Sequence, residues 1–206
     1  MKITRISQQQ VRKERFSVYV DGEYRLSLSQ DQLADAGLRS GDELTPAQFT
    51  QLAHLSELGK ALEGAYRFLS YRSRSRQEVE QHLRRKQYDA SLIDEVIAQL
   101  EAVGVLNDLL FAREWIANRQ LLNPRSPLEL KVELRQKGIS PGLIDEAVAS
   151  MTWDNEVVMI ESLIAQKKLR RRYPEERKLL SYLASKGYSF QAIRTVLEAN
   201  NEDKTI

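Results

Sequence analysis

Near the start of the chain, apolar and polar residues alternate with the period of β-structure. Apolar residues occupy every second position over 16–20 and again over 24–28, as in strands that bury one face. Between the two runs stand Asp21 and Gly22, residue types that accept the positive φ angles of a tight turn. The pattern predicts a β-hairpin.

The residues after the hairpin predict a small mixed domain. Ser29 and Gln32 have the spacing of a helix-capping box, and Gly37 can end the short helix that they begin. Residues 41–44 are expected to return as a brief strand. Because an isolated hairpin is only marginally stable, the sheet must pack on a helix or on the rest of the protein.

From Thr45 onward, apolar residues recur at helical spacing, and a self-comparison reveals a repeat. The first copy contains Val79, Leu83, Lys86, Leu92, Ile93, Val96 and Ile97. These positions recur 51 residues later as Leu130, Leu134, Lys137, Leu143, Ile144, Ala147 and Val148, and 49 residues further as Leu179, Leu183, Lys186, Ala192, Ile193, Val196 and Leu197. Leu83, Leu134 and Leu183 should therefore occupy equivalent buried sites.

Helix boundaries repeat together with the apolar pattern. Ser75 with Glu78, and Ser126 with Glu129, have capping-box spacing, and Pro127 and Pro174 suit first helical turns. Each unit then contains a tight turn, in which glycine ends one helix and serine or aspartate caps the next. The expected leading helices of the three units are Gly59 to Tyr71, Asp108 to Leu122 and Asn155 to Leu169.

These patterns predict a mainly α fold: three tandem three-helix repeats forming an elongated, solenoid-like body, with a small N-terminal domain that contains the hairpin. The expected domains are 1–58, then repeats over 59–107, 108–154 and 155–206. An extended stack of repeats offers a surface that can follow a long, repetitive partner.

Composition limits the chemistry. The 206 residues contain no cysteine, which excludes disulfides, thiolate zinc sites and cysteine nucleophiles. No apolar run has the length of a signal peptide or of a membrane span. We therefore expect a soluble, cytoplasmic protein without a membrane partner.

Positive charge is concentrated in two places, although 31 Lys and Arg residues nearly balance 29 acids overall. Residues 60–86 contain eight basic residues and three acids, and residues 167–178 contain seven basic residues and two acids, an excess of five in each. Such clusters suit nucleic acid or an acidic protein, or else form a solvated helix face. The candidate binding residues are Arg72, Arg74, Arg76, Arg84, Arg85, Lys86, Lys167, Lys168, Arg170, Arg171 and Arg172.

Other candidate sites have simpler interpretations. His54 and His82 lack partners at metal-ligand spacing. The acid pairs 94–95 and 145–146 are expected in first helical turns, where the helix dipole favours negative charge, rather than in catalysis. Trp115 could stack on a base but has the spacing of a core residue. No phosphate-binding glycine loop or catalytic triad is recognisable, so we expect neither an enzyme, a cofactor nor a small-molecule substrate.

The ordered set of motifs resembles the RecX family. The resemblance rests on the three tandem units, the segment from Leu106 to Arg119, and the turn Lys137-Gly138-Ile139-Ser140 followed by Leu143-Ile144-Asp145. It covers about Ala65 to Ala199, and the hairpin resembles an extension found on longer members. Gln87 and Asp89 depart from the Gly and Ser of the other two units.

The resemblance implies a regulator that lies along the groove of a RecA filament on single-stranded DNA and suppresses ATP hydrolysis, strand exchange and co-protease activity. The alternative is a helix-turn-helix protein in which 140–149 or 189–199 would be a recognition helix. Asp145 and Glu146 argue against it, since their negative charge would meet phosphates and acceptor-rich base edges.

Overall fold

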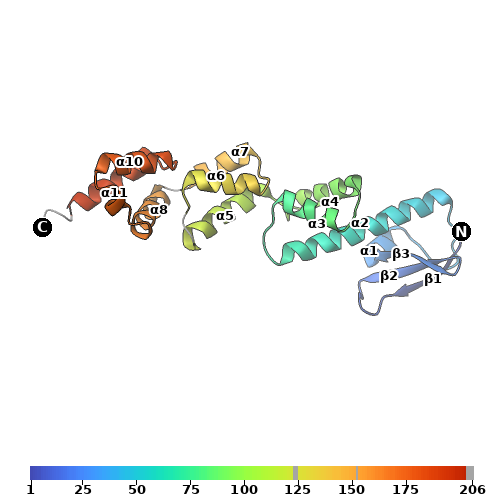
Figure 1. Cartoon of the computed structure of the whole chain (residues 1–206). Coiled ribbons are helices and arrows are strands. Elements are labelled where there is room, and N and C mark those ends of the chain that lie inside the picture. The colour runs from blue at the N-terminus through green and yellow to red at the C-terminus, as the bar shows by residue number, and fades with distance from the viewer. Residues whose placement is uncertain (123–124, 152, 203–206) are drawn as a thin grey trace. The chain divides into compact units, whose positions relative to one another are not determined.

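The structure, a computed structural model, describes residues 1–122, 125–151 and 153–202 (Figure 1). The last four residues of the range expected for the third repeat lie outside these described residues. The chain divides into two compact units: residues 1–72 with 79–103 form the first, and residues 73–78 with the chain from 104 onward form the second.

The first unit begins with a three-stranded antiparallel sheet in the order β1-β2-β3. Its strands are β1 (Ile3–Gln8), β2 (Arg15–Val20) and β3 (Glu23–Ser29). The predicted hairpin is confirmed, because β2 pairs with β3 and the turn residues Asp21 and Gly22 have φ angles of 51° and 86°. Strand β1 was not expected from the pattern.

One face of the sheet packs against helix α2 (Pro46–Ser70). The apolar cluster between them contains Ile3, Val18, Val20, Leu26, Leu28, Leu44 and Leu52. Ser56 on α2 continues the hydrogen bonding of β3: its Oγ donates to the carbonyl of Ser27 at 2.7 Å and accepts from the Ser27 amide at 3.1 Å. The brief strand expected over 41–44 is a single bridge between Lys2 and Glu43.

Helix α1 (Gln30–Asp35) begins with the predicted capping box of Ser29 and Gln32. Helix α2 then runs without interruption through position 59, so the expected leading helix of the first repeat is its second half. The cause is a second capping box, Thr45 with Gln48, which starts the helix early. The domain boundary at 58, like the other expected boundaries, stays a prediction.

Two further helices complete the first repeat, and seven more occupy the described part of the second unit. The former are α3 (Arg76–Arg85) and α4 (Ala90–Ala102); the latter are α5 (Asp108–Leu122), α6 (Pro127–Gln136), α7 (Pro141–Ala149), α8 (Trp153–Gln166), α9 (Leu169–Arg172), α10 (Glu176–Ser185) and α11 (Phe190–Glu202). The mainly α fold with tandem three-helix repeats is thus confirmed, as is the leading helix α5.

The third repeat differs from the expectation at two points. Its leading helix ends at Gln166, because Lys168 takes a left-handed φ of 48°, and the one-turn helix α9 follows. Pro174 precedes the N-cap residue Glu175 instead of lying in the first turn of α10.

The three repeat leucines are buried as predicted. Leu83, Leu134 and Leu183 are each at most 1% exposed. In the second unit, apolar residues of repeats 2 and 3 form one continuous cluster, which runs from Phe111 to Leu197. These two repeats therefore share a core.

Candidate functional site

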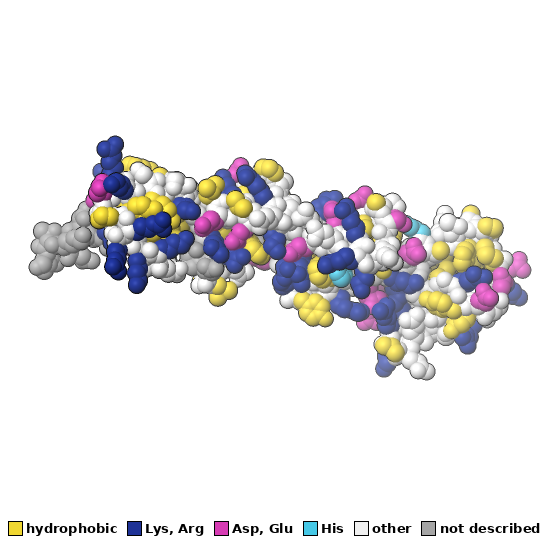
Figure 2. All heavy atoms as spheres, viewed as in Figure 1, with side chains coloured by type: hydrophobic (Ala, Val, Ile, Leu, Met, Phe, Trp, Pro, Cys, Tyr) yellow, Lys and Arg dark blue, Asp and Glu magenta, His cyan; other side chains and the backbone are white. Residues whose placement is uncertain are grey.

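The eleven basic residues expected to bind a partner occur in both units. Arg72, Arg84, Arg85 and Lys86 belong to the first unit; Arg74, Arg76, Lys167, Lys168, Arg170, Arg171 and Arg172 belong to the second. All are exposed except Arg74 and Arg170, which are half-buried. Figure 2 shows Lys and Arg side chains on the surface of each unit. A single binding edge formed from both sets stays a prediction.

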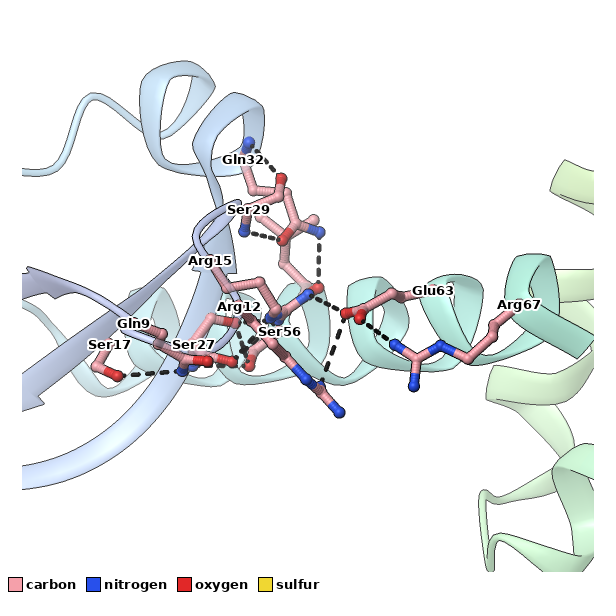
Figure 3. A network of polar contacts seen from close by, with 11 residues as sticks. Gln9, Arg12, Arg15, Ser17, Ser27, Ser29, Gln32, Ser56, Glu63 and Arg67 are labelled. Carbon is pink, nitrogen blue, oxygen red and sulfur yellow. Dashed lines mark hydrogen bonds and ion pairs between the residues drawn. The ribbon is translucent and has the colours of Figure 1, made fainter.

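The first unit also holds a cluster of arginines around one carboxylate (Figure 3). On α2, Arg67 contacts Glu63 at 2.9 Å. Arg15, at the start of β2, lies 3.7 Å from the same carboxylate, and Arg12, in the loop between β1 and β2, lies 3.8 Å from it. Three cations thus share one negative charge. The position of Arg12 beside Glu63 was not predicted from the sequence.

Arg15 has a structural role in this cluster. Its side chain is buried, and its guanidinium donates to the Ser27 carbonyl at 2.6 Å and to the Ser27 hydroxyl at 3.0 Å. Burial lowers the pKa of Arg15, and the negative charge of Glu63 opposes that shift. The buried arginine therefore ties the sheet to α2 through Ser27 and Glu63, while Arg12 and Arg67 are more than half exposed.

Beside Glu63 lies a cleft of about 360 Å³. Helix α2 contributes a stripe at helical spacing, and the loop after β1 and the end of α3 contribute the remaining walls. The lining residues are Arg12, Lys60, Glu63, Gly64, Arg67, Phe68, Tyr71, His82, Leu83, Lys86 and Tyr88. Of the expected binding residues, only Lys86 lines this cleft. The spacing 60, 64, 67, 68 and 71 is the sequence signal that could have identified its α2 wall.

The second repeat has a different arrangement at the corresponding place. Glu133 accepts a hydrogen bond from Trp115 Nε1 at 2.8 Å, contacts Arg119 at 2.7 Å and lies 3.4 Å from Arg125. Lys137 lies over the Trp115 ring. Trp115 is half-buried against the apolar cluster, so it packs as a core residue whose polar edge is hydrogen-bonded.

The third repeat presents two stacked tyrosines. The rings of Tyr173 and Tyr182 are 5.0 Å apart, and Arg172 and Lys186 lie 5.6 Å and 5.8 Å from those rings respectively. This places one of the three consecutive arginines beside aromatic surface. Such pairs attract through the charge distribution of the ring.

Three of the four acids in the repeated pairs contact a nitrogen-bearing side chain. They lie in second helical turns, because α4 begins at Ala90 and α7 at Pro141, so the expected first-turn placement was wrong. Glu95 contacts His54 at 2.8 Å, Asp145 contacts Lys131 at 2.7 Å and Glu146 contacts Arg113 at 3.1 Å. The hydrogen bond and charge of Lys131 lower the pKa of Asp145. These contacts give Glu95, Asp145 and Glu146 a structural role.

Two further properties of the described residues concern metals and membranes. Within ranges 1–122, 125–151 and 153–202, no group of three or more His, Cys, Asp or Glu side chains could hold a metal ion. In the same part of the chain, no helix is both long enough and apolar enough to cross a bilayer.

An N-terminal sheet followed by tandem three-helix repeats defines a class of helical-repeat proteins. Three family profiles match this chain: "Regulatory protein RecX N-terminal domain" over residues 1–45, "RecX, first three-helix domain" over 61–100 and "RecX, second three-helix domain" over 107–148. The chain belongs to the RecX family of regulatory proteins.

Relatives agree with this assignment, and a solved structure shares the fold. "Regulatory protein RecX" of Bacillus subtilis (strain 168) is 35% identical over 98% of this chain and 79% of its own length. The protein of the same name from Leuconostoc citreum (strain KM20) is 30% identical over 98% of this chain and 77% of its own. A crystal structure of a regulatory protein RecX superposes with a TM-score of 0.77 at 24% identity, covering 96% of this chain and 98% of that one.

Proposed function

We propose that this protein binds RecA recombinase filaments on single-stranded DNA in the cytoplasm and inhibits their recombinase, ATPase and co-protease activities. The observation that carries the proposal is membership of the RecX family over nearly the whole chain. Non-enzymatic regulation fits a fold whose distinctive surfaces are basic and aromatic.

The repeats support a mechanism in which many modest contacts add up. A helical polymer presents the same site at regular intervals, and tandem repeats can engage several such sites at once. Each further contact forms at the high effective concentration set by the first, which raises the total affinity. Basic side chains on both units can face phosphate or acidic protein.

The test is ATP hydrolysis by a RecA-type filament on single-stranded DNA, measured against increasing amounts of the purified full-length chain. Inhibition without any added metal or cofactor specific to this protein is expected. An unchanged hydrolysis rate, with strand exchange and filament stability also unchanged over a range of salt, would remove the functional assignment. Specific binding to one duplex sequence without recombinase would favour the helix-turn-helix alternative.

Surface substitutions test the role of the third repeat better than truncation, because repeats 2 and 3 share one apolar cluster. Arg171 and Arg172 are exposed, so replacing both by Ala should leave the fold intact and weaken inhibition. If they contact single-strand phosphates, each lost contact should flatten the salt dependence of binding by about 0.7 log units per log unit of salt. An unchanged slope would assign them to the solvated face.

A further inference from the structure

The cleft in the first unit is lined by residues of both the N-terminal domain and the first repeat. Arg12 comes from the loop between β1 and β2, the stripe of Lys60, Gly64, Arg67, Phe68 and Tyr71 from α2, and Lys86 from the residue after α3. Its volume of about 360 Å³ lies within the usual range of small-molecule sites, about 300 to 1,000 Å³. The loop between β1 and β2 thus helps to build a surface that the repeat alone would lack.

The charge of this cleft favours an anion. Arg12, Lys60, Arg67 and Lys86 line it together with one carboxylate, Glu63, which leaves three positive charges in excess. That carboxylate also lies near the buried Arg15. A phosphate group entering the cleft would therefore meet more positive charges than the single carboxylate can balance.

Aromatic surface lies beside the cations. Phe68 and His82 stack with ring centroids 4.1 Å apart and an angle of 6° between their planes. Tyr71, one helical turn after Phe68, is 77% exposed. Every nucleobase has a π face that can stack on such a ring, whereas an acidic peptide gains little from it. Cations and rings together therefore favour single-stranded nucleic acid over an acidic protein segment.

Gly64 supplies an independent observation. A glycine destabilises a helix interior relative to alanine, and a Cβ added at Gly64 would have no heavy atom within 4 Å. By contrast, a Cβ at Gly59, five residues earlier, would lie 2.7 Å from the side chain of Gln32. Packing explains Gly59 but not Gly64. The absence of a side chain at Gly64 keeps the floor of the cleft open.

We propose that this cleft binds single-stranded DNA directly: Arg12, Lys60, Arg67 and Lys86 contact the phosphodiester backbone, and Tyr71 stacks on a base. The inference rests on the proposed function insofar as filament DNA is the natural ligand. The contact itself requires neither recombinase nor a nucleoside triphosphate, and the loop between β1 and β2 takes part in it through Arg12.

The experiment measures binding of the full chain alone to a fluorescent oligodeoxythymidine of about 12 nucleotides by anisotropy, as a function of salt. Replacing Lys60 and Lys86 by Ala should flatten the salt dependence by about 1.4 log units per log unit of salt, since two phosphate contacts are lost. Replacing Arg25 and Arg39 together by Ala is the matched control, because it also removes two positive charges, and both residues are exposed in the same unit and do not line the cleft. An unchanged slope in the cleft variant, or an equal loss in the control, would overturn the proposal.

Stacking is tested at Tyr71. Tyr71→Ala should weaken binding by about tenfold, and Tyr71→Phe should retain it, because the ring and not the hydroxyl makes the contact. Polyglutamate of similar length is the competitor. If polyglutamate displaces the DNA at equal charge concentration and Tyr71→Ala has no effect, the cleft is an acidic-protein site and the proposal is wrong.

Gly64→Leu separates binding from folding. The variant should unfold at the same temperature as the parent protein or higher, since leucine is a good helix former with open space around it. It should nevertheless bind the oligonucleotide at least several-fold more weakly, because its side chain fills the cleft. Full affinity in a folded Gly64→Leu variant would contradict the proposal. Unchanged DNA binding in these variants, together with full inhibition of recombinase by the parent protein, would overturn this site and leave the proposed function intact.

Discussion

The first and second repeats have the same buried core positions but different surface residues. Leu83 and Leu134 are equivalent and buried in both. At the position one residue earlier, repeat 1 has His82, which stacks on Phe68, and repeat 2 has Glu133, which holds Trp115, Arg119 and Arg125. This position therefore supplies a stacked ring in repeat 1 and, in repeat 2, a carboxylate that holds two arginines.

The turns of the repeats differ in whether a side chain fits at the residue with a positive φ angle. Gln87, Gly138 and Gly187 occupy equivalent positions, with φ angles of 64°, 80° and 85°. A Cβ at Gly138 would lie 2.6 Å from the side chain of Gln77, and one at Gly187 would lie 3.3 Å from the backbone nitrogen of Leu128. Gln87 is exposed and has room for its side chain. Gly138 and Gly187 are therefore required for two reasons: φ is positive, and the start of another helix packs closely against the turn.

The largest expected effect tests whether the repeats are equivalent at their cores. Substituting Ala for Leu83, Leu134 or Leu183 should each lower the free energy of unfolding by about 2 to 5 kcal/mol, because each leaves a cavity at a site at most 1% exposed. Urea titration followed by circular dichroism measures the change. A loss below about 1 kcal/mol at one of the three would show that its repeat has a different core.

The next effect concerns the turns. Gly138→Ala should cost about 2 kcal/mol, since it combines a left-handed conformation with a contact that must shift. Gln87→Gly should instead stabilise the protein by about 1 kcal/mol by relieving the same backbone strain. Opposite signs in urea titrations would confirm the difference between the two turns. A stable Gly138→Ala variant would show that Gln77 moves aside without cost.

Sequence patterns predicted those parts of the fold that depend on local periodicity and capping. The hairpin, the capping boxes at Ser29, Ser75 and Ser126, and the bounds of α5 are examples. Strand β1 was missed because its burial alternates weakly, and only Ile3 is fully buried. The break after Gln166 was missed because nothing in the residue type of Lys168 requires a left-handed φ.

The candidate site was less predictable than the fold. Basic clusters in the sequence indicated Lys86, but Arg12 is more than 70 positions away and reaches the cleft only through the packing of the sheet on α2. Likewise, the neutralisation of Arg119 and Arg125 by Glu133 depends on how α5 and α6 pack. Local composition therefore shows where charge accumulates, and tertiary packing decides which charge is available.

A smaller effect tests the role of position 133. Glu133→Gln should make repeat 2 resemble repeat 1 by leaving Arg119 and Arg125 without their shared carboxylate. Affinity for an oligodeoxythymidine should then rise by about fivefold at low salt. Glu198→Gln, which removes an exposed acid from α11, is the control for net charge. Equal increases in both variants would show that only total charge matters.

The smallest effect concerns the contact between the capping box of α6 and the third repeat. Partial burial raises the pKa of Glu129. Hydrogen bonds from the Ser126 amide and hydroxyl, and the charge of Lys186 at 3.7 Å, lower it by more, so the pKa lies below the ordinary value for a glutamate. Because the folded-state pKa is depressed, this carboxylate contributes stability above about pH 4.5 and loses that contribution as the pH falls through the folded-state pKa.

Glu129→Gln should therefore be less stable than the parent protein at pH 7, by less than about 1 kcal/mol for a group that is one-third exposed. The two proteins should converge in stability as the pH falls through the lowered folded-state pKa of Glu129, because the carboxylate of the parent then becomes protonated. Urea titrations of both proteins from pH 7 to pH 3 measure the difference. A difference that stays constant over this range would mean that Glu129 acts through the shape of its side chain and not through its charge.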